Sequence, residues 1–185
     1  MEFSSPEKSI TEILQFLGED PTREGLKDTP SRVVKSWKEL YGGYNQDPST
    51  ILTTFHEEGA TQIVILRNIE MYSTCEHHMI TFSGKAHIAY LPKDGVVVGI
   101  SKLARLLEVY ARRLQIQERI GKQVTDALMK YLQPLGAACI IDAQHLCMQA
   151  RGVGKQESIM STSSLTGVFL EDPATRAELY QLLKL

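Results

Sequence analysis

The sequence predicts an α+β fold in which helices precede a sheet-forming region. Apolar residues recur at helical spacing in the first quarter of the chain, alternate as in strands from residue 62, and return to helical spacing near residue 101. Strand patterns resume at residue 137, and a helical pattern closes the chain. We therefore expect an N-terminal helical segment over residues 1–60 and a sheet-containing domain over residues 61–185.

The composition is that of one globular domain with a small appendage. The chain has 185 residues, 43% hydrophobic and 23% charged, and its 20 basic and 22 acidic residues give a formal net charge of −2. This balance argues against a dedicated nucleic-acid-binding protein, which usually carries a strong basic excess. No apolar run reaches the roughly 20 residues of a membrane helix, and the first residues lack the pattern of a signal peptide. We expect a cytoplasmic protein without nucleic-acid or membrane partners.

Two amphipathic helices are expected in the first quarter. The first begins with a capping serine and a proline at residues 4–7 and ends at Gly18. The second begins at Thr29-Pro30 and ends at Gly42, and its apolar residues form one stripe. Two short helices bury little apolar surface by themselves, so we expect them to need a partner surface.

Strands and a central pair of helices are expected in the remainder. The strand patterns cover residues 62–66, 80–88, 96–98, 137–151 and 158–165. Between the third and fourth patterns lie two helices, one capped by Ser101 and one running from about Gln117 to Pro134. A last helix is expected to begin at Asp172-Pro173.

The densest group of chemically active side chains is the run Cys75–His78, and His145-Leu146-Cys147 follows far downstream. Cys75 and His78 are three residues apart, which lets a short loop turn both onto one ion. His145 and Cys147 are two apart in an expected strand, so they would face the same side. Thiolate and imidazole are favoured zinc ligands, so these motifs predict a metal site. Cys139 lies too far along the same expected strand to join them and is interpreted as a core thiol.

The spacing leaves two forms of this metal site open. If two cysteines and two histidines all bind, the site is closed and structural. If only Cys75, His78 and Cys147 bind, a water can take the fourth position and the site can do chemistry. His77 and His145 would then flank that water as proton carriers.

A second group of residues is suited to binding anions. Lys102 and Arg105 are three apart on one helix, and Ser101 stands at its start, where free backbone N–H groups favour an anion. The alternative is an ordinary solvated helix face. Glu118 is either an acidic residue in the first turn of a helix or an acceptor for two N–H groups of a purine edge. The glycine-containing run at 152–156 is not a P-loop, and the paired motifs of zinc base deaminases are absent.

Five motifs in order resemble those of the zinc-dependent GTP cyclohydrolase I family. They lie at residues 23–35, 73–78, 99–105, 115–119 and 145–152, so the resemblance covers nearly the whole chain. It implies a tunnelling fold, in which ββααββ units with an antiparallel sheet and helices on one face join side by side into a barrel. It also implies a homodecamer of two face-to-face pentamers.

The resemblance also implies the roles of individual residues. The ligands of a zinc ion (Zn²⁺) fall on Cys75, His78 and Cys147, which favours the open site, and proton transfer falls on His145 with His77. Guanine recognition falls on Glu118, beside Gln117. The implied triphosphate contacts are Ser101, Lys102, Arg105, Arg151, Arg32 and Lys35.

The implied reaction converts GTP and water to 7,8-dihydroneopterin triphosphate and formate, the first step of tetrahydrofolate and pterin biosynthesis. Zinc makes hydroxide available for attack on C8 of guanine, and His145 protonates N7. One alternative is a nitrile reductase of the same fold, which uses a cysteine nucleophile and NADPH, but the paired metal motifs argue against it. The other is a closed structural-zinc protein whose basic helix binds phosphates.

Overall fold

The computed structural model describes residues 5–184 and separates the chain into two compact units. The contacts divide it between Gly42 and Gly43. Residues 43–60, which the sequence groups with the N-terminal segment, therefore belong by their contacts to the second unit. No helix in the described part of the chain is long and apolar enough to cross a membrane.

The first unit consists of helices α1 (Pro6–Phe16) and α2 (Thr29–Leu40). The Ser5 side chain caps α1 by accepting a hydrogen bond from the backbone N–H of Lys8 at 3.3 Å. Ile10 is the only buried side chain on either helix. The two helices therefore leave most of their apolar residues partly or fully exposed.

The second unit is built on a five-stranded sheet in the order β5-β2-β3-β6-β7. Its strands are β2 (Val64–Cys75), β3 (Thr81–Leu91), β5 (Leu114–Gln115), β6 (Gly136–His145) and β7 (Met160–Gly167). The four long strands pair antiparallel, whereas β5 pairs parallel with the end of β2. The expectation of a purely antiparallel sheet is thus wrong at β5. This strand has only two residues, which is too short for a strand pattern to be recognised in the sequence.

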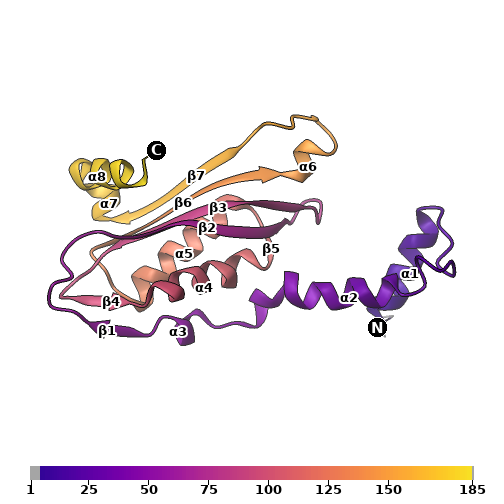
Figure 1. The fold of residues 1–185 in the computed structure, drawn as a ribbon, viewed down its shortest axis with the longest axis horizontal. Coiled ribbons are helices and arrows are strands. Elements are labelled where there is room, and N and C mark those ends of the chain that lie inside the picture. The colour runs from indigo at the N-terminus through magenta and orange to yellow at the C-terminus, as the bar shows by residue number, and fades with distance from the viewer. Residues whose placement is uncertain (1–4, 185) are drawn as a thin grey trace. The chain divides into compact units, whose positions relative to one another are not determined.

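A second, two-stranded sheet joins β1 (Thr54–His56) to β4 (Val96–Val98). The sequence predicts β4 but not β1, because all three residues of β1 are exposed and show no alternation. Two short helical segments, η1 (Gly42–Asn45) and α3 (Pro48–Ile51), come before β1. This small sheet lies at the end of the unit from which α4 starts (Figure 1).

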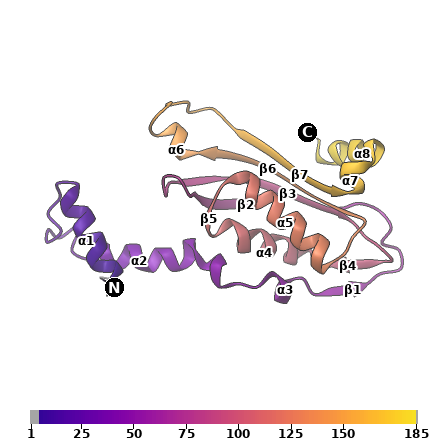
Figure 2. The ribbon, with the colours of Figure 1, turned by 180° about the vertical axis from the view of Figure 1, so that it is seen from behind.

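Helices cover both faces of the main sheet (Figures 1 and 2). Helices α4 (Ile100–Ala111) and α5 (Gln117–Tyr131) enclose the larger core on one face, together with alternate β6 residues such as Cys139. The intervening residues of β6 pack on the other face against α7 (Val168–Glu171) and α8 (Pro173–Leu183). The expectation of helices on one face is therefore wrong for α7 and α8. The continuous apolar run at residues 137–141 is typical of a strand buried on both sides, so the sequence carried a signal for the second layer that the one-face expectation did not include.

Two local predictions in this unit are corrected by the structure. The N-cap of α4 is Gly99, so Ser101 lies within the first turn and does not cap the helix. Strand β6 ends at His145, and residues expected to continue it form the short helix α6 (Leu146–Gln149). As expected, Asp172 caps α8, its carboxylate accepting from the N–H groups of Ala174 and Thr175.

Candidate metal centre

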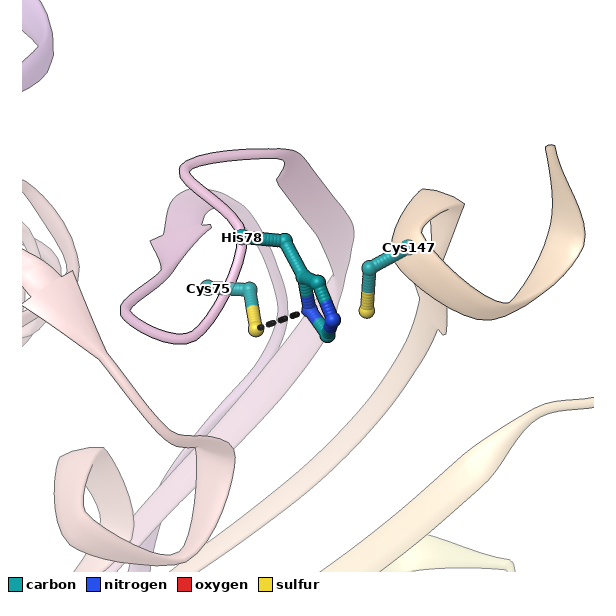
Figure 3. Close-up of side chains that lie close together, drawn as sticks. All are labelled: Cys75, His78 and Cys147. Carbon is teal, nitrogen blue, oxygen red and sulfur yellow. Dashed lines mark hydrogen bonds between the residues drawn. The ribbon is translucent and has the colours of Figure 1, made fainter. Parts of the chain in front are cut away.

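Three potential metal ligands converge at one end of the second unit. The Sγ atoms of Cys75 and Cys147 and a ring nitrogen of His78 all lie within 4.8 Å of one another (Figure 3). Cys75 Sγ lies 3.8 Å from His78 Nδ1. Among the described residues no other group of potential ligands is so close, and His145 is outside this one. The geometry therefore favours the three-ligand form over the closed form with two cysteines and two histidines.

The loop after β2 holds two of these ligands in place. The backbone N–H of Cys75 donates to Ile80 O at 2.9 Å, and Met79 N–H donates to Cys75 O at 2.8 Å. Met79 has a φ of +54°, a left-handed conformation that closes the turn. On the other side, the Glu76 N–H donates to Gln115 O in β5 at 3.0 Å. Bonds within the turn and one bond to β5 thus hold the loop that carries Cys75 and His78.

The third ligand, Cys147, reaches the site through α6. Pairing of β6 with β3 places His145 opposite Phe82, beside the metal-binding loop, and the helical turn then directs Cys147 toward Cys75. Burial, followed by the neighbouring Cys75 thiol, raises the pKa of Cys147. Two adjacent thiolates repel each other, and a divalent cation between them removes that cost. Two sulfurs and one imidazole at this separation are a donor set that zinc favours.

His145 and Gln117 form a fixed pair beside the ligands. The Gln117 amide nitrogen donates to Ile141 O at 2.8 Å and to Met160 O at 2.9 Å, which fixes the orientation of the amide. Its oxygen therefore faces His145 and accepts a hydrogen bond from Nε2 at 2.8 Å. The His145 ring also stacks on Phe82, with centroids 4.5 Å apart. His145 is consequently held as the tautomer with the proton on Nε2.

Gln117 lies in a different setting from the one expected of a substrate contact. Its side chain is buried, with only 1% of the residue exposed, and its amide nitrogen also donates to Thr162 Oγ1 at 3.1 Å. Both polar atoms are thus used within the protein. Burial lowers the pKa of His145, against a smaller opposing effect of the Glu118 carboxylate. Gln117 supports His145 in this structure, and no local sequence signal indicates that role.

Two cavities adjoin these residues. One, of about 340 Å³, lies between α5 and β7 and is lined by Glu118, Gly121, Lys122 and residues 162–164. The other, of about 220 Å³, is lined by His145, Cys147, Met148 and residues 158–160. Glu118 is exposed, as an acceptor for an incoming ligand must be.

The candidate anion-binding residues do not all meet the metal group. Helix α4 leads from β4 to β5, and β5 pairs with β2 at Cys75, so the ligands lie near the C-terminal end of α4. Ser101, Lys102 and Arg105 occupy its first turns. At 1.5 Å per residue, Ser101 is about 15 Å of helix away from Ala111. Within one chain, Ser101 is therefore the most distant of the three from the metal ligands, whereas Arg105 is about 9 Å of helix away from Ala111.

Of the remaining predicted site residues, two lie beside the metal ligands and two lie on α2 in the first unit. Arg151 reaches the metal group, its Nη1 lying 3.3 Å from His78 Nε2. His77 is exposed, with its Nδ1 3.8 Å from Cys75 Sγ. Arg32 and Lys35 are exposed on α2 in the first unit, where Arg32 pairs with Asp28 at 3.1 Å.

One ion pair at the site was not anticipated from the sequence. The Arg119 guanidinium contacts both carboxylate oxygens of Glu76, and it holds the pKa of that carboxyl below its ordinary value. The only sequence signal for this pair is that each residue stands inside a motif already singled out, at 73–78 and at 115–119.

Comparison with known proteins shows similarity along nearly the whole chain. The model of the family GTP cyclohydrolase I matches residues 6–184. GTP cyclohydrolase 1 of Wolinella succinogenes is 57% identical over 93% of this chain and 92% of its own length. The enzymes of the same name from Mycolicibacterium gilvum and Mycobacterium leprae are 48% and 49% identical over 96% of this chain and 88% and 87% of theirs. Among solved structures, an archaeosine synthase QueF-Like in the apo form matches with a TM-score of 0.47 and 15% identity, over 57% of this chain and 94% of its own.

Proposed function

The chain belongs to the GTP cyclohydrolase I family, and we propose that it acts on GTP with a zinc ion held by Cys75, His78 and Cys147. It is a hydrolase of pterin and folate biosynthesis, and the proposed products are 7,8-dihydroneopterin triphosphate and formate. The convergence of two thiols and one imidazole within 4.8 Å carries the proposal for the metal. Family membership sets aside the nitrile reductase alternative.

The three donors fit zinc and leave one of its four coordination positions open for a water molecule. Catalytic zinc sites typically have three protein ligands and one open position. Zinc bound there would lower the pKa of a water molecule toward neutrality and so supply hydroxide for hydrolysis. The turn at 75–80 and α6 orient the ligands, and Arg151 adds a positive charge beside His78.

We assign proton transfer to His145, with His77 in a supporting role. Because Nε2 of His145 donates to Gln117, the nitrogen left for proton exchange with the substrate is Nδ1. Nδ1 carries no proton in this tautomer, so in the proposed exchange it first takes the proton that the attacking water loses and then passes it to N7 of guanine. Stacking on Phe82 keeps the imidazole in one orientation, so the side chain does not have to change rotamer before the proton is transferred.

We assign recognition of guanine to Glu118. A carboxylate can accept two N–H groups from the edge of the base, and the cavity of about 340 Å³ beside Glu118 gives the base access to it. The proposed triphosphate contacts remain Ser101, Lys102, Arg105, Arg151, Arg32 and Lys35. Gln117, expected as a substrate contact, is assigned to holding His145, which lines the second cavity of about 220 Å³.

The separation of Ser101 from the metal ligands supports a site completed by a second copy of the chain. Within the described residues, the outer edge of β7 is unpaired, and so is that of β2 from Val64 to Ser73. Edge strands of this length favour pairing with another chain. We propose that the second unit is a tunnelling-fold domain whose copies join side by side, as a homodecamer of two pentamers. Its location is proposed to be cytoplasmic.

The activity is tested with purified, zinc-loaded protein and GTP, by assaying formate and the absorbance of the dihydropterin. Wild type should yield both products, and Cys147→Ala should yield neither and bind less zinc. Cys139→Ala is the matched control, because Cys139 is a core thiol on β6, the strand that leads into α6 and Cys147. Tight zinc binding by wild type without release of formate would contradict the proposal.

The shared site is tested by mixing two variants that fail for different reasons. One is Cys147→Ala, and the other combines Lys102→Ala with Arg105→Ala. Co-expressed copies should regain activity at low GTP concentration, because some sites combine intact ligands from one copy with intact cations from the other. Mixed oligomers, verified by two affinity tags, that show no recovery would contradict a site shared between copies.

A further inference from the structure

We propose that the ion pair between Arg119 and Glu76 is a clamp that positions the metal-binding loop against the first turn of α5. In doing so it sets the separation between the metal ligands and Glu118. The inference rests on the proposed function for the roles of the ligands and of Glu118. Neither member of the pair touches a ligand atom in the described contacts, so both are positioning residues.

The pair has the geometry of a rigid connection. Arg119 Nη1 lies 2.5 Å from Glu76 Oε2, and Arg119 Nη2 lies 3.0 Å from Glu76 Oε1. Such a two-point contact between a planar guanidinium and a carboxylate fixes orientation as well as distance. Arg119 Nη1 also lies 3.4 Å from Gln115 Oε1, and the Gln115 amide nitrogen donates to Tyr110 O at 3.0 Å. The guanidinium is therefore held from two sides.

The pair also differs from every other ion pair in the described residues. The other four join residues four apart, such as Lys122 and Asp126 on α5. Arg119 and Glu76 are separated by 43 positions and join two elements. A contact of this kind fixes the position of one segment relative to another, which a pair within one helix cannot do.

The positions of the two residues along the chain specify what is held. Glu76 stands between the ligands Cys75 and His78, and Arg119 directly follows Glu118. Backbone contacts secure the start of the loop, through Cys75 and the N–H of Glu76, but His77 and His78 are exposed. The clamp therefore adds a side-chain contact to the backbone hydrogen bonds of the loop, in which the His78 N–H donates to Cys75 O at 3.4 Å.

The clamp is expected to act locally and to contribute little to global stability. The side chains of Arg119 and Glu76 keep 40% and 31% of their surface exposed. Ion pairs with this exposure contribute little to the free energy of unfolding. A loss of metal affinity without a matching loss of stability is thus the signature that separates positioning from general stabilisation.

The test measures metal binding without GTP, so it does not depend on the activity. Arg119→Gln and Glu76→Gln proteins are titrated with Co²⁺, following the thiolate-to-cobalt absorption, and with zinc against a chelator. We expect affinity to fall about 10–100-fold, the range found for groups that orient metal ligands. Unfolding temperatures of the metal-free proteins should stay close to wild type. The matched control, Arg112→Gln, removes the ion pair between Glu108 and the residue that follows α4, and it should keep wild-type affinity.

The reciprocal variant Glu76→Arg with Arg119→Glu tests the pairing itself. It should recover at least part of the affinity that either charge-removing variant loses. Unchanged affinity in both single variants, or an equal loss in Arg112→Gln, would overturn the clamp. If wild type binds Co²⁺ through its thiolates and releases no formate from GTP, the proposed function fails, whereas the clamp still stands or falls on the affinities.

Discussion

The two ends of the second unit solve the problem of placing functional groups in different ways. At the metal end, β2, the loop after it and α6 bring two thiols and an imidazole within 4.8 Å of one another. At the other end of α4, Ser101 and Arg105 are exposed on the first turns of a helix. A small ion can be enclosed by segments that strand pairing already aligns. Arg105 lines a cavity of about 420 Å³ together with Gln46, Ile51, Ala104 and Glu108, so the described part of this end offers a polyanion one cation and one carboxylate rather than a set of converging cations.

Removal of the metal should have the largest effect on turnover, and its structural effect should stay within the metal end. Dialysis against a strong chelator is expected to reduce turnover of GTP to background, because the three ligands act only through the metal that they hold. Added zinc should restore turnover. Far-ultraviolet circular dichroism should not change, since the strands holding the ligands pair through their backbones. Turnover that survives a verified loss of metal would contradict the assignment.

A change at the cation end should weaken substrate binding and leave the metal in place. Arg105→Ala is expected to raise KM for GTP about 10–100-fold, because a hydrogen bond to a charged group contributes about 1.5–3 kcal/mol. The zinc content, measured by atomic absorption, should equal that of wild type. A fall in zinc content would show that the two ends are coupled.

Cysteine alkylation distinguishes thiols at the metal end from the core thiol. Burial raises the pKa of Cys139 to about 12, so its thiolate is scarce near neutral pH and iodoacetamide should leave it unmodified in the folded protein. Cys147 is partly exposed and should react in the metal-free protein, and zinc should protect it. Peptide mass spectrometry measures each site, and equal labelling of Cys147 with and without zinc would contradict its role as a ligand.

The smallest expected effect concerns His87, a buried residue away from both ends. Burial lowers its pKa below 6.5, outweighing Asp142, which raises it, while Arg67 and Lys85 lower it further. The unfolded chain therefore binds a proton first as pH falls, so stability is full above pH 6.5 and decreases through the lower folded pKa. His87→Gln should flatten this decrease in urea unfolding measured at several pH values. A slope identical to wild type would show that His87 does not contribute.

Where the structure agrees with the sequence, the signal was local. Helices α1, α2 and α5 follow from apolar spacing within one segment, and Asp172 caps α8 as its position before a proline indicates. Cys75 and His78 could be paired for the same reason, because three residues separate them along one turn. Such features depend on a few neighbouring residues, so a single segment carries the information.

Where the structure differs, residues from distant segments decided the outcome. Cys147 was expected to share a strand face with His145, but β6 ends at His145 and a helical turn follows. Gln117 bonds to β6 and β7 through Ile141 and Met160, so its role depends on three elements meeting.

The sequence by itself determined the residue chemistry and the order of the elements: thiols, imidazoles and cations stand at spacings that local geometry can use. Only the tertiary structure decided which of them meet, that α7 and α8 cover the second face of the sheet, and that Glu76 is tied to Arg119. The physical reason is that strand register and helix packing are set by burial and hydrogen bonding between segments far apart in the chain. Those interactions leave only weak traces in the local pattern of any one segment.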